Sequence, residues 1–368
     1  NELLVRVNDV ADIYGTDTQY SIASVQYYDD STDDSIDNGT VFTLGAGGVT
    51  NSSVAINASN QVSINDGAGG SAEFDLIAPL APTSTAGKLI VGSYQLDAAN
   101  VVTTNAVNFN DTITVVGAHQ VDAKSITASA ANVSKVYDGT TEMSGVTIGL
   151  STLESGDKVT VSGLGAFTQK NVGETLDYAV TNLTLGGDDA ANYYLTGGTS
   201  LSGSNGEITA RTLTLSYAGI NKDYDGDDIA SVLVTDNRVA GDTIIVTPTA
   251  SFSDKNVGVG KVVSISNVTI GGTDGGNYTV ASSTGSTTAD IIRLSSVTWV
   301  GATSGNWFDP ANWAGGAVPD LSNVANVIIP NGVTVTFDNN VTSPATAASI
   351  EANAVNIDSL GTAGSLQH

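Results

Sequence analysis

The 368-residue chain has no cysteine, one methionine and only two histidines. It therefore has no thiolate for metal or redox chemistry and little imidazole for general acid–base catalysis. With so few of the side chains that enzymes use, we expect a protein that is not an enzyme and requires no cofactor. The absence of cysteine is compatible with an oxidising exterior and also with the cytoplasm, so it does not by itself place the protein.

Basic residues are also scarce, because 12 lysines and arginines stand against 38 acidic residues and give a formal net charge of −26. Proteins that bind nucleic acids or anionic membrane surfaces neutralise phosphates with clustered basic side chains. This composition excludes both functions. Acids that are so little opposed by bases suit salty or calcium-containing surroundings, which screen their repulsion. We therefore expect an extracellular or cell-surface protein, with calcium as a possible ligand.

Long apolar runs are missing as well, so no membrane-spanning helix is expected. The first ten residues lack the basic and apolar regions of a signal peptide. The chain starts in a strand-like segment, residues 3–7, and stops at His368 without an evident cap. We expect it to be a piece of a longer polypeptide.

The apolar residues that are present follow a period of two, as in residues 158–162, 213–216 and 263–266. Such alternation is typical of half-buried strands, and no stretch keeps a helical period beyond two turns. Turn pairs such as Asp138-Gly139 and Asn331-Gly332 recur along the chain. The pattern predicts an all-β chain of small modules, and both an immunoglobulin-like sandwich and a β-grasp-like module fit it.

An internal repeat sets the predicted domain organisation. Two copies share a Tyr-Asp-Gly turn, a Lys-Asn-Val-Gly segment and a Gly-Gly-x-x-x-x-Asn-Tyr segment. These lie at residues 137–139, 170–173 and 186–193 of the first copy and at 224–226, 255–258 and 271–278 of the second. A divergent copy with Tyr14-Gly15 precedes them, and a tryptophan-rich segment follows. We predict a divergent module at 1–122, repeats at 123–210 and 211–293, and a further segment at 294–368.

These shared segments resemble the YDG repeat of very large bacterial adhesins. The first module, with Tyr14-Gly15, is similar to the MBG repeat that accompanies it. Residues 299–319, which contain all three tryptophans, resemble the segment that opens a β-helical region in filamentous-haemagglutinin-like secreted proteins. The resemblance implies a surface or biofilm-matrix adhesin of the two-partner or autotransporter type, in which such repeats act mainly as spacers.

The residues themselves favour the same function. Modules of about 85 residues follow one another without a flexible linker, since residues 207–211 run directly from one into the next. We expect a stiff stalk that extends a binding region for attachment to cells, surfaces or biofilm matrix. Its expected partners are glycans or proteins of the host surface or matrix, bound inside or outside this chain. Self-association into fibres is left open.

Two acidic clusters are candidates for calcium, because acids at alternate positions gather oxygen ligands around that ion. The alternative is a solvated loop, since the first repeat has Val136 and Thr140 where the second has acids. The candidate ligands are Asp29, Asp30, Asp33, Asp34 and Asp37 in one cluster, and Asp223, Asp225, Asp227 and Asp228 in the other.

A carbohydrate-binding region is the second functional hypothesis, because exposed aromatic rings stack on sugars. The candidate platform consists of Trp307, Trp313, Tyr193 and Tyr194. The competing prediction is that the tryptophans cap a hydrophobic end and that the tyrosines of the Tyr-Asp-Gly turns pack and donate hydrogen bonds. His119 has no nucleophile motif near it, and we expect a histidine at the surface or at a strand end.

Overall fold

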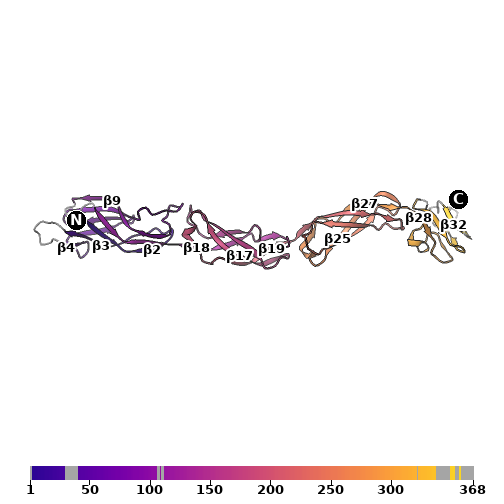
Figure 1. The fold of residues 1–368 in the computed structure, drawn as a ribbon, viewed down its shortest axis with the longest axis horizontal. Coiled ribbons are helices and arrows are strands. Elements are labelled where there is room, and N and C mark those ends of the chain that lie inside the picture. The colour runs from indigo at the N-terminus through magenta and orange to yellow at the C-terminus, as the bar shows by residue number, and fades with distance from the viewer. Residues whose placement is uncertain are drawn as a thin grey trace. The chain divides into compact units, whose positions relative to one another are not determined.

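The computed structural model describes residues 2–29, 40–105, 108, 112–320, 322–336, 349–352 and 356–357. These residues form β-strands, loops and 3-10 turns of three residues, without an α-helix (Figure 1). The all-β prediction is confirmed. The helical turns in the described residues are too short to cross a lipid bilayer.

The first module is a sandwich of two four-stranded sheets. One sheet has the order β10-β1-β3-β4, formed by Ile113–Val116, Leu3–Val7, Ile22–Asp29 and Thr40–Leu44. The other has the order β5-β6-β7-β9, formed by Ser53–Ile56, Gln61–Asn65, Ser71–Ile77 and Asp97–Thr104. Alternate residues of both sheets, such as Val5, Val25, Ile64 and Phe74, meet in one buried cluster. The period of two in the sequence therefore places one face of each sheet in the core.

A three-stranded sheet of order β2-β11-β8 completes this module, with strands Val10–Ile13, Ala118–Asp122 and Gly92–Gln95. Its β11 carries His119, which is only 4% exposed and lies 3.0 Å from the Tyr20 hydroxyl through Nδ1. Nε2 lies 3.6 Å from Oδ2 of Asp12. His119 is therefore a core residue, and the expectation of a surface or strand-end histidine is wrong. The hydrogen-bonding neighbours on β2 and the following loop make its burial tolerable.

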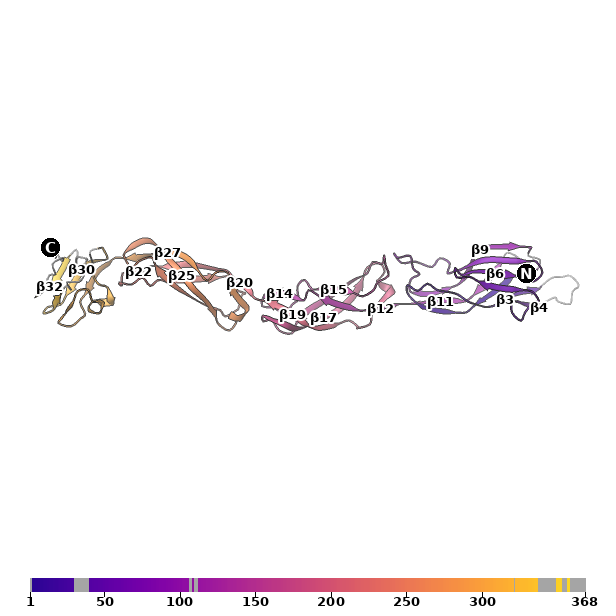
Figure 2. The same ribbon diagram turned by 180° about the vertical axis from the view of Figure 1, so that it is seen from behind.

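The second repeat contains three sheets. Four strands have the order β22-β27-β25-β24, formed by Lys222–Asp223, Gly285–Ile292, Gly258–Gly271 and Ile245–Phe252. The parallel pair is β20 with β26, Arg211–Leu213 and Tyr278–Val280, and the antiparallel pair is β21 with β23, Leu215–Ile220 and Ser231–Asp236. The strands β27 and β25 lie side by side in both views, and β22 is labelled beside them in Figure 2 (Figures 1 and 2).

The first repeat has the same three sheets in the same order, as the repeated sequence predicts. Its four strands follow β14-β19-β17-β16, formed by Ser134–Val136, Leu201–Thr209, Gly173–Gly186 and Thr160–Phe167. The pairs are β12 with β18, Lys124–Ile126 and Tyr193–Leu195, and β13 with β15, Ala128–Ala131 and Thr147–Leu150.

The described strands of the C-terminal segment pair only in parallel, whereas the preceding modules combine antiparallel and parallel pairs. One sheet has the order β28-β30-β32, formed by Leu294–Thr298, Val324–Ile329 and Ser349–Ala352, and the other has β29-β31-β33, formed by Ser304–Asn306, Thr334–Thr336 and Asn356–Ile357. All four strand pairs are parallel. Two sheets of stacked parallel strands are the arrangement of β-helix rungs.

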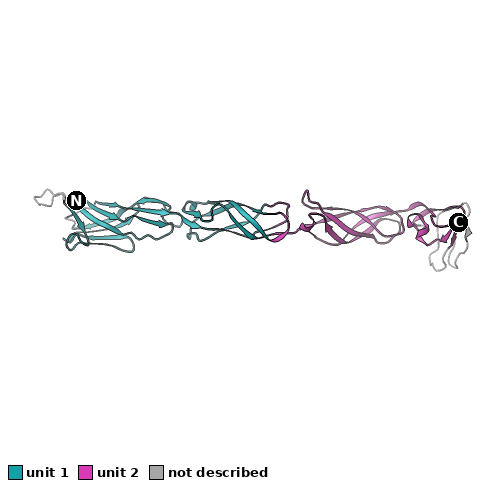
Figure 3. Cartoon of the chain, turned by 90° about the horizontal axis from the view of Figure 1, so that it is seen from below, with its two compact units in different colours: residues 1–134, 142–168, 175–206 teal, residues 135–141, 169–174, 207–368 magenta. Residues whose placement is uncertain are grey.

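The described chain divides into two compact units, shown in teal and magenta in Figure 3. The second unit contains the second repeat and the C-terminal segment. It also contains Lys135–Thr141 and Gln169–Glu174, which belong by sequence to the first repeat. These two loops carry the first Tyr-Asp-Gly turn and the first Lys-Asn-Val-Gly segment.

His119 predicts a pH dependence for the first module. Burial lowers the pKa of His119 below its usual value, and the Asp12 carboxylate opposes this only in part. The unfolded chain therefore binds the proton first as the pH falls through about 6.5, so this contribution to stability is present above that pH and is lost below it. We expect amide exchange in β11, corrected for intrinsic rates, to accelerate between pH 7 and 5, and His119→Gln to flatten that dependence. Equal slopes in the two proteins would contradict this assignment.

Candidate functional site

The residues that the two repeats share gather at two joints between successive modules. In the first unit, loops of the first module dock on the first repeat. In the second unit, Lys135–Thr141 and Gln169–Glu174 of the first repeat dock on the second. We call these donating segments the docking loops. We call the surface that receives them, built around an Asp, an Asn and a Tyr of the following module, the socket.

Two tyrosines and one carboxylate oxygen form the centre of the joint in the second unit. Tyr137 of the Tyr-Asp-Gly turn donates its hydroxyl proton to Oδ2 of Asp242 at 2.9 Å. Tyr278 of the socket donates to the same oxygen at 2.6 Å. The two rings meet edge to face, with centroids 5.4 Å apart and an angle of 73°. One oxygen of a half-buried carboxylate thus joins a tyrosine from each module.

The joint in the first unit repeats this geometry. Tyr14 and Tyr193 each donate to Oδ2 of Asp157 at 2.6 Å. Their ring centroids lie 5.3 Å apart at an angle of 73°. The divergent first module therefore presents its tyrosine as the first repeat does. Val121 and Ile126, one from each module, join the two tyrosines in a single buried cluster.

Burial raises the pKa of all four tyrosines above the usual value, and the hydrogen bond to the carboxylate raises it further. A hydroxyl in this position must keep its proton in order to donate to the carboxylate. The tyrosines therefore act as hydrogen-bond donors throughout the physiological pH range.

A buried asparagine makes the second contact of each joint. Oδ1 of Asn277 accepts the backbone N–H of Val172 at 2.9 Å, and Nδ2 lies 3.3 Å from Oδ1 of Asn171. In the other joint, Oδ1 of Asn192 accepts the backbone N–H of Val91 at 3.0 Å. Each asparagine therefore accepts a hydrogen bond from a backbone N–H of the neighbouring module. That N–H loses its water on docking and would otherwise be left without an acceptor.

The Gly-Gly-x-x-x-x-Asn-Tyr motif builds the turn that presents this asparagine. The 3-10 turns η1, Ala190–Asn192, and η2, Gly275–Asn277, end at it. Gly272 has φ +95°, and a Cβ there would lie 2.5 Å from the Thr243 carbonyl oxygen. Only glycine fits such a position, because other residues disfavour this φ and would also clash.

The glycine of the Tyr-Asp-Gly turn is required for the same two reasons. Gly139 has φ +81°, and a Cβ would lie 2.8 Å from Cγ1 of Val239 in the socket. Gly15 has φ +92°, and a Cβ would lie 2.5 Å from Oε1 of Glu154. The aspartate has a local role, because Asp138 accepts from Nζ of Lys135 at 2.7 Å. In this motif the tyrosine donates a hydrogen bond to the socket and the aspartate stabilises the turn. The glycine allows the backbone to approach the socket closely.

Asp157 and Asp242 were not predicted as functional residues. Each follows a glycine in the sequence, in Ser-Gly-Asp and Ala-Gly-Asp, and the two occupy equivalent places in the repeats. This shared Gly-Asp pair was the signal that could have identified them.

The acidic cluster of the second repeat surrounds a lysine and is not arranged as a calcium site. Nζ of Lys222 lies 2.7 Å from Asp225 and 2.6 Å from Asp227. The ammonium lowers the pKa of Asp227. Asp223 and Asp228 do not complete a cluster, since no group of three or more acids or histidines that could hold a metal occurs in the described part of the chain. The sequence spacing did not reveal this lysine between the acids, and calcium binding by the loop stays a prediction.

The other calcium candidates cannot be placed. Asp29 ends β3, and its side chain lies outside the described residues, as do Asp30, Asp33, Asp34 and Asp37.

The predicted sugar platform is not formed by Trp307, Trp313 and Tyr193. Both tryptophans are 1% exposed, and Tyr193 lies within the joint. The indole N–H of Trp313 donates to the Trp307 carbonyl at 2.6 Å. Tyr194, next along the strand, is 51% exposed and has none of these rings as an exposed neighbour. A stacking platform needs open ring faces, which the three buried rings lack.

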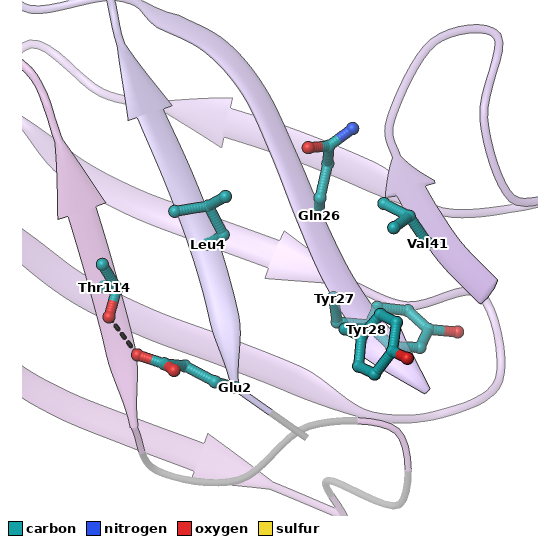
Figure 4. A pocket seen from close by; sticks show the side chains of 7 residues that line it. All are labelled: Glu2, Leu4, Gln26, Tyr27, Tyr28, Val41 and Thr114. Atoms are coloured by element: carbon teal, nitrogen blue, oxygen red, sulfur yellow. Dashed lines mark hydrogen bonds between the residues drawn. The ribbon is translucent and has the colours of Figure 1, made fainter. Parts of the chain in front are cut away.

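A shallow hollow of about 270 Å³ lies on the outer face of the β10-β1-β3-β4 sheet (Figure 4). Leu4, Gln26 and Val41 line it, and Glu2 and Thr114 are hydrogen-bonded to each other at one side. It has no group of convergent charged side chains, and we assign it no ligand.

The family model of the YDG domain matches residues 122–201 and 209–289. The chain contains a YDG-type region of two copies. The matched ranges include the socket residues Tyr193, Tyr278, Asn192 and Asn277, whereas Tyr14 and Val91 of the first joint lie outside them. The similarity of the other segments to MBG repeats and to filamentous-haemagglutinin-like proteins stays a prediction.

No curated protein sequence matches the chain. Among solved structures, the extracellular domain of protocadherin gamma B4 is similar over 82% of this chain and 52% of its own length. The identity is 10% and the TM-score 0.19. The chain thus spans about half of that protein, and a score this low supports no comparison of fold or function.

The asparagine contact predicts a local change in amide exchange. Asn277→Ala removes the acceptor of the Val172 N–H, and we expect exchange of that amide to rise about fivefold, since such a bond contributes roughly 1 kcal/mol. The measurement is hydrogen–deuterium exchange of the whole chain. Asn192→Ala is the matched control, which should affect Val91 and leave Val172 unchanged. Unchanged exchange at Val172 in Asn277→Ala would contradict the contact.

The lysine-centred loop predicts indifference to calcium. Because the Lys222 ammonium already lies between Asp225 and Asp227 and bonds to both, we expect the same amide exchange over residues 222–229 in millimolar calcium and in chelator. Lys222→Met should accelerate exchange of this loop, since the two carboxylates then repel each other. Protection of the wild-type loop that appears only with calcium would show that the ion binds there after all.

Proposed function

We propose that this chain is a non-catalytic, structural spacer of a secreted or cell-surface bacterial adhesin, which holds a binding region away from the surface that carries it. The observation that carries the proposal is the joint, because its tyrosine pair, carboxylate and asparagine occur twice with nearly the same distances. Because the same contact occurs between successive modules, its role under this proposal is to connect them.

The construction of the joint favours stiffness over free hinging. The two modules share a buried cluster in the first unit, and the connecting residues form strands up to the boundary. A joint that buries apolar rings and also pairs its polar groups restricts motion more than a flexible linker does. Repeated joints of this kind give the nearest-neighbour stability of a tandem array.

The net charge supports an extracellular location under the same proposal. A charge of −26 keeps a repetitive β protein soluble and disfavours pairing of its exposed strand edges. Partners of the adhesin, glycans or proteins of a host surface or matrix, are proposed to bind elsewhere than at the joints, whose polar groups are already paired.

Small-angle X-ray scattering of the whole chain tests the proposal. A compact protein of this length has a radius of gyration of about 21 Å, and we expect a clearly larger value. The combined variant Tyr137→Ala, Asn277→Ala should broaden the distance distribution, because one joint is loosened. Val136→Ala, an exposed change beside the same turn, should scatter like the wild type. A radius near the compact value would overturn the spacer proposal.

A further inference from the structure

The C-terminal segment contains a third socket, outside the residues that match the YDG domain. Oδ1 of Asn323 accepts the backbone N–H of Val257 at 2.8 Å, and Nδ2 lies 3.3 Å from Oδ1 of Asn256. The corresponding distances at Asn277 are 2.9 and 3.3 Å. Val257 and Asn256 belong to the second Lys-Asn-Val-Gly segment, so the docking loop is the one that the repeat pattern predicts.

The backbone around Asn323 also follows the earlier sockets. Its N–H donates to the Asp320 carbonyl at 3.2 Å, as that of Asn277 does to Asp274 at 3.0 Å. The residue after the asparagine then starts a strand parallel to the segment that leaves the preceding module. In register, the pairs are Lys124 with Tyr193, Arg211 with Tyr278, and Leu294 with Val324.

The tyrosine of the second Tyr-Asp-Gly turn meets a different environment in this socket. Tyr224 donates to the Val318 carbonyl at 3.3 Å in place of a carboxylate. Gly226 has φ +86°, and a Cβ would lie 2.8 Å from the Gly316 carbonyl oxygen, so the close approach of the turn is retained. Val324 stands at the position of the second tyrosine, and the buried cluster there also contains three indoles, with Trp313 5.0 Å from Trp299 and 4.9 Å from Trp307.

The interior of the parallel segment continues into the second repeat. One buried cluster contains Tyr224 and Phe252 of the repeat together with Val297, Val327 and Trp307 of the segment. A stack of β-rungs exposes its apolar interior at the first rung, and such ends require a cap. Here the docking loops and the end of the repeat cover that rung.

We propose that the second repeat is the N-terminal cap of the parallel β segment. The capping surface consists of the Tyr224 turn, the Asn256-Val257 loop and Phe252, and the partner it fits is a first β-rung with an Asp-x-x-Asn turn and a cluster of indoles. The cap and the first rung fold as one unit, so the segment depends on this joint for its stability.

Tryptophan fluorescence of the whole chain tests the cap, because all three tryptophans lie between residues 299 and 313 and report on this segment alone. We expect Asn323→Ala to lower the denaturant midpoint of the fluorescence transition and to raise the unfolding constant of the segment about tenfold. Tyr224→Ala removes a ring from the shared core and should have a larger effect. Their matched controls are Asn277→Ala and Tyr137→Ala, which disrupt the preceding joint, leave the contacts of Asn323 and Tyr224 in place and should shift the midpoint less.

Two outcomes would overturn the cap. In one, Asn323→Ala and Tyr224→Ala unfold at the wild-type midpoint, which means that the segment is stable by itself. In the other, the control variants shift the midpoint equally, which means a general effect of weakened repeats. If Tyr224→Ala fails to fold, Tyr224→Phe keeps the ring and removes only the bond to Val318, and a measurable but smaller shift is then expected.

Discussion

A carboxylate oxygen shared by two tyrosine hydroxyls is the interaction at the centre of the joints at Asp157 and Asp242. A half-buried carboxylate still needs hydrogen-bond donors, and at both joints the two donors come from different modules. If the modules separate, the carboxylate loses one donor and the tyrosine hydroxyl loses its acceptor. The contact therefore stabilises the docked turn, because each of its groups would be costly to leave unpaired.

The joint also explains why the repeat boundary in the sequence differs from the boundary between the two compact units. The first Tyr-Asp-Gly turn and the first Lys-Asn-Val-Gly segment lie inside the second compact unit, although the strands before and after them belong to the first repeat. Each repeat thus completes its neighbour's polar contacts and apolar cluster. The stability of a module then includes a term from the next module in the chain, as in other tandem arrays.

The sequence predicted much of the fold, because strand alternation and repetition are properties of the chain itself. The two repeats have the same sheets, and Tyr137 packs and donates a hydrogen bond as its motif suggested. The partners in the joint were harder to predict, since Asp242 lies far along the chain from Tyr137 and only the fold brings them together. The acids around Lys222 show the opposite difficulty. Their spacing matches a calcium loop, but a cation of the protein occupies the centre.

The three sockets share the asparagine contact but differ in the tyrosine contact, so the two contacts have different roles. The asparagine contact hardly varies, with distances of 3.0, 2.9 and 2.8 Å to the backbone N–H of a valine. A backbone N–H is present whatever the side chain, so this contact sets the register without selecting a sequence. The tyrosine contact varies from a carboxylate with a second tyrosine to a backbone carbonyl beside three indoles. Selection between neighbours is therefore expected at the tyrosine, where a carboxylate acceptor beside a second tyrosine and a carbonyl acceptor beside an apolar cluster place different demands on the docking turn.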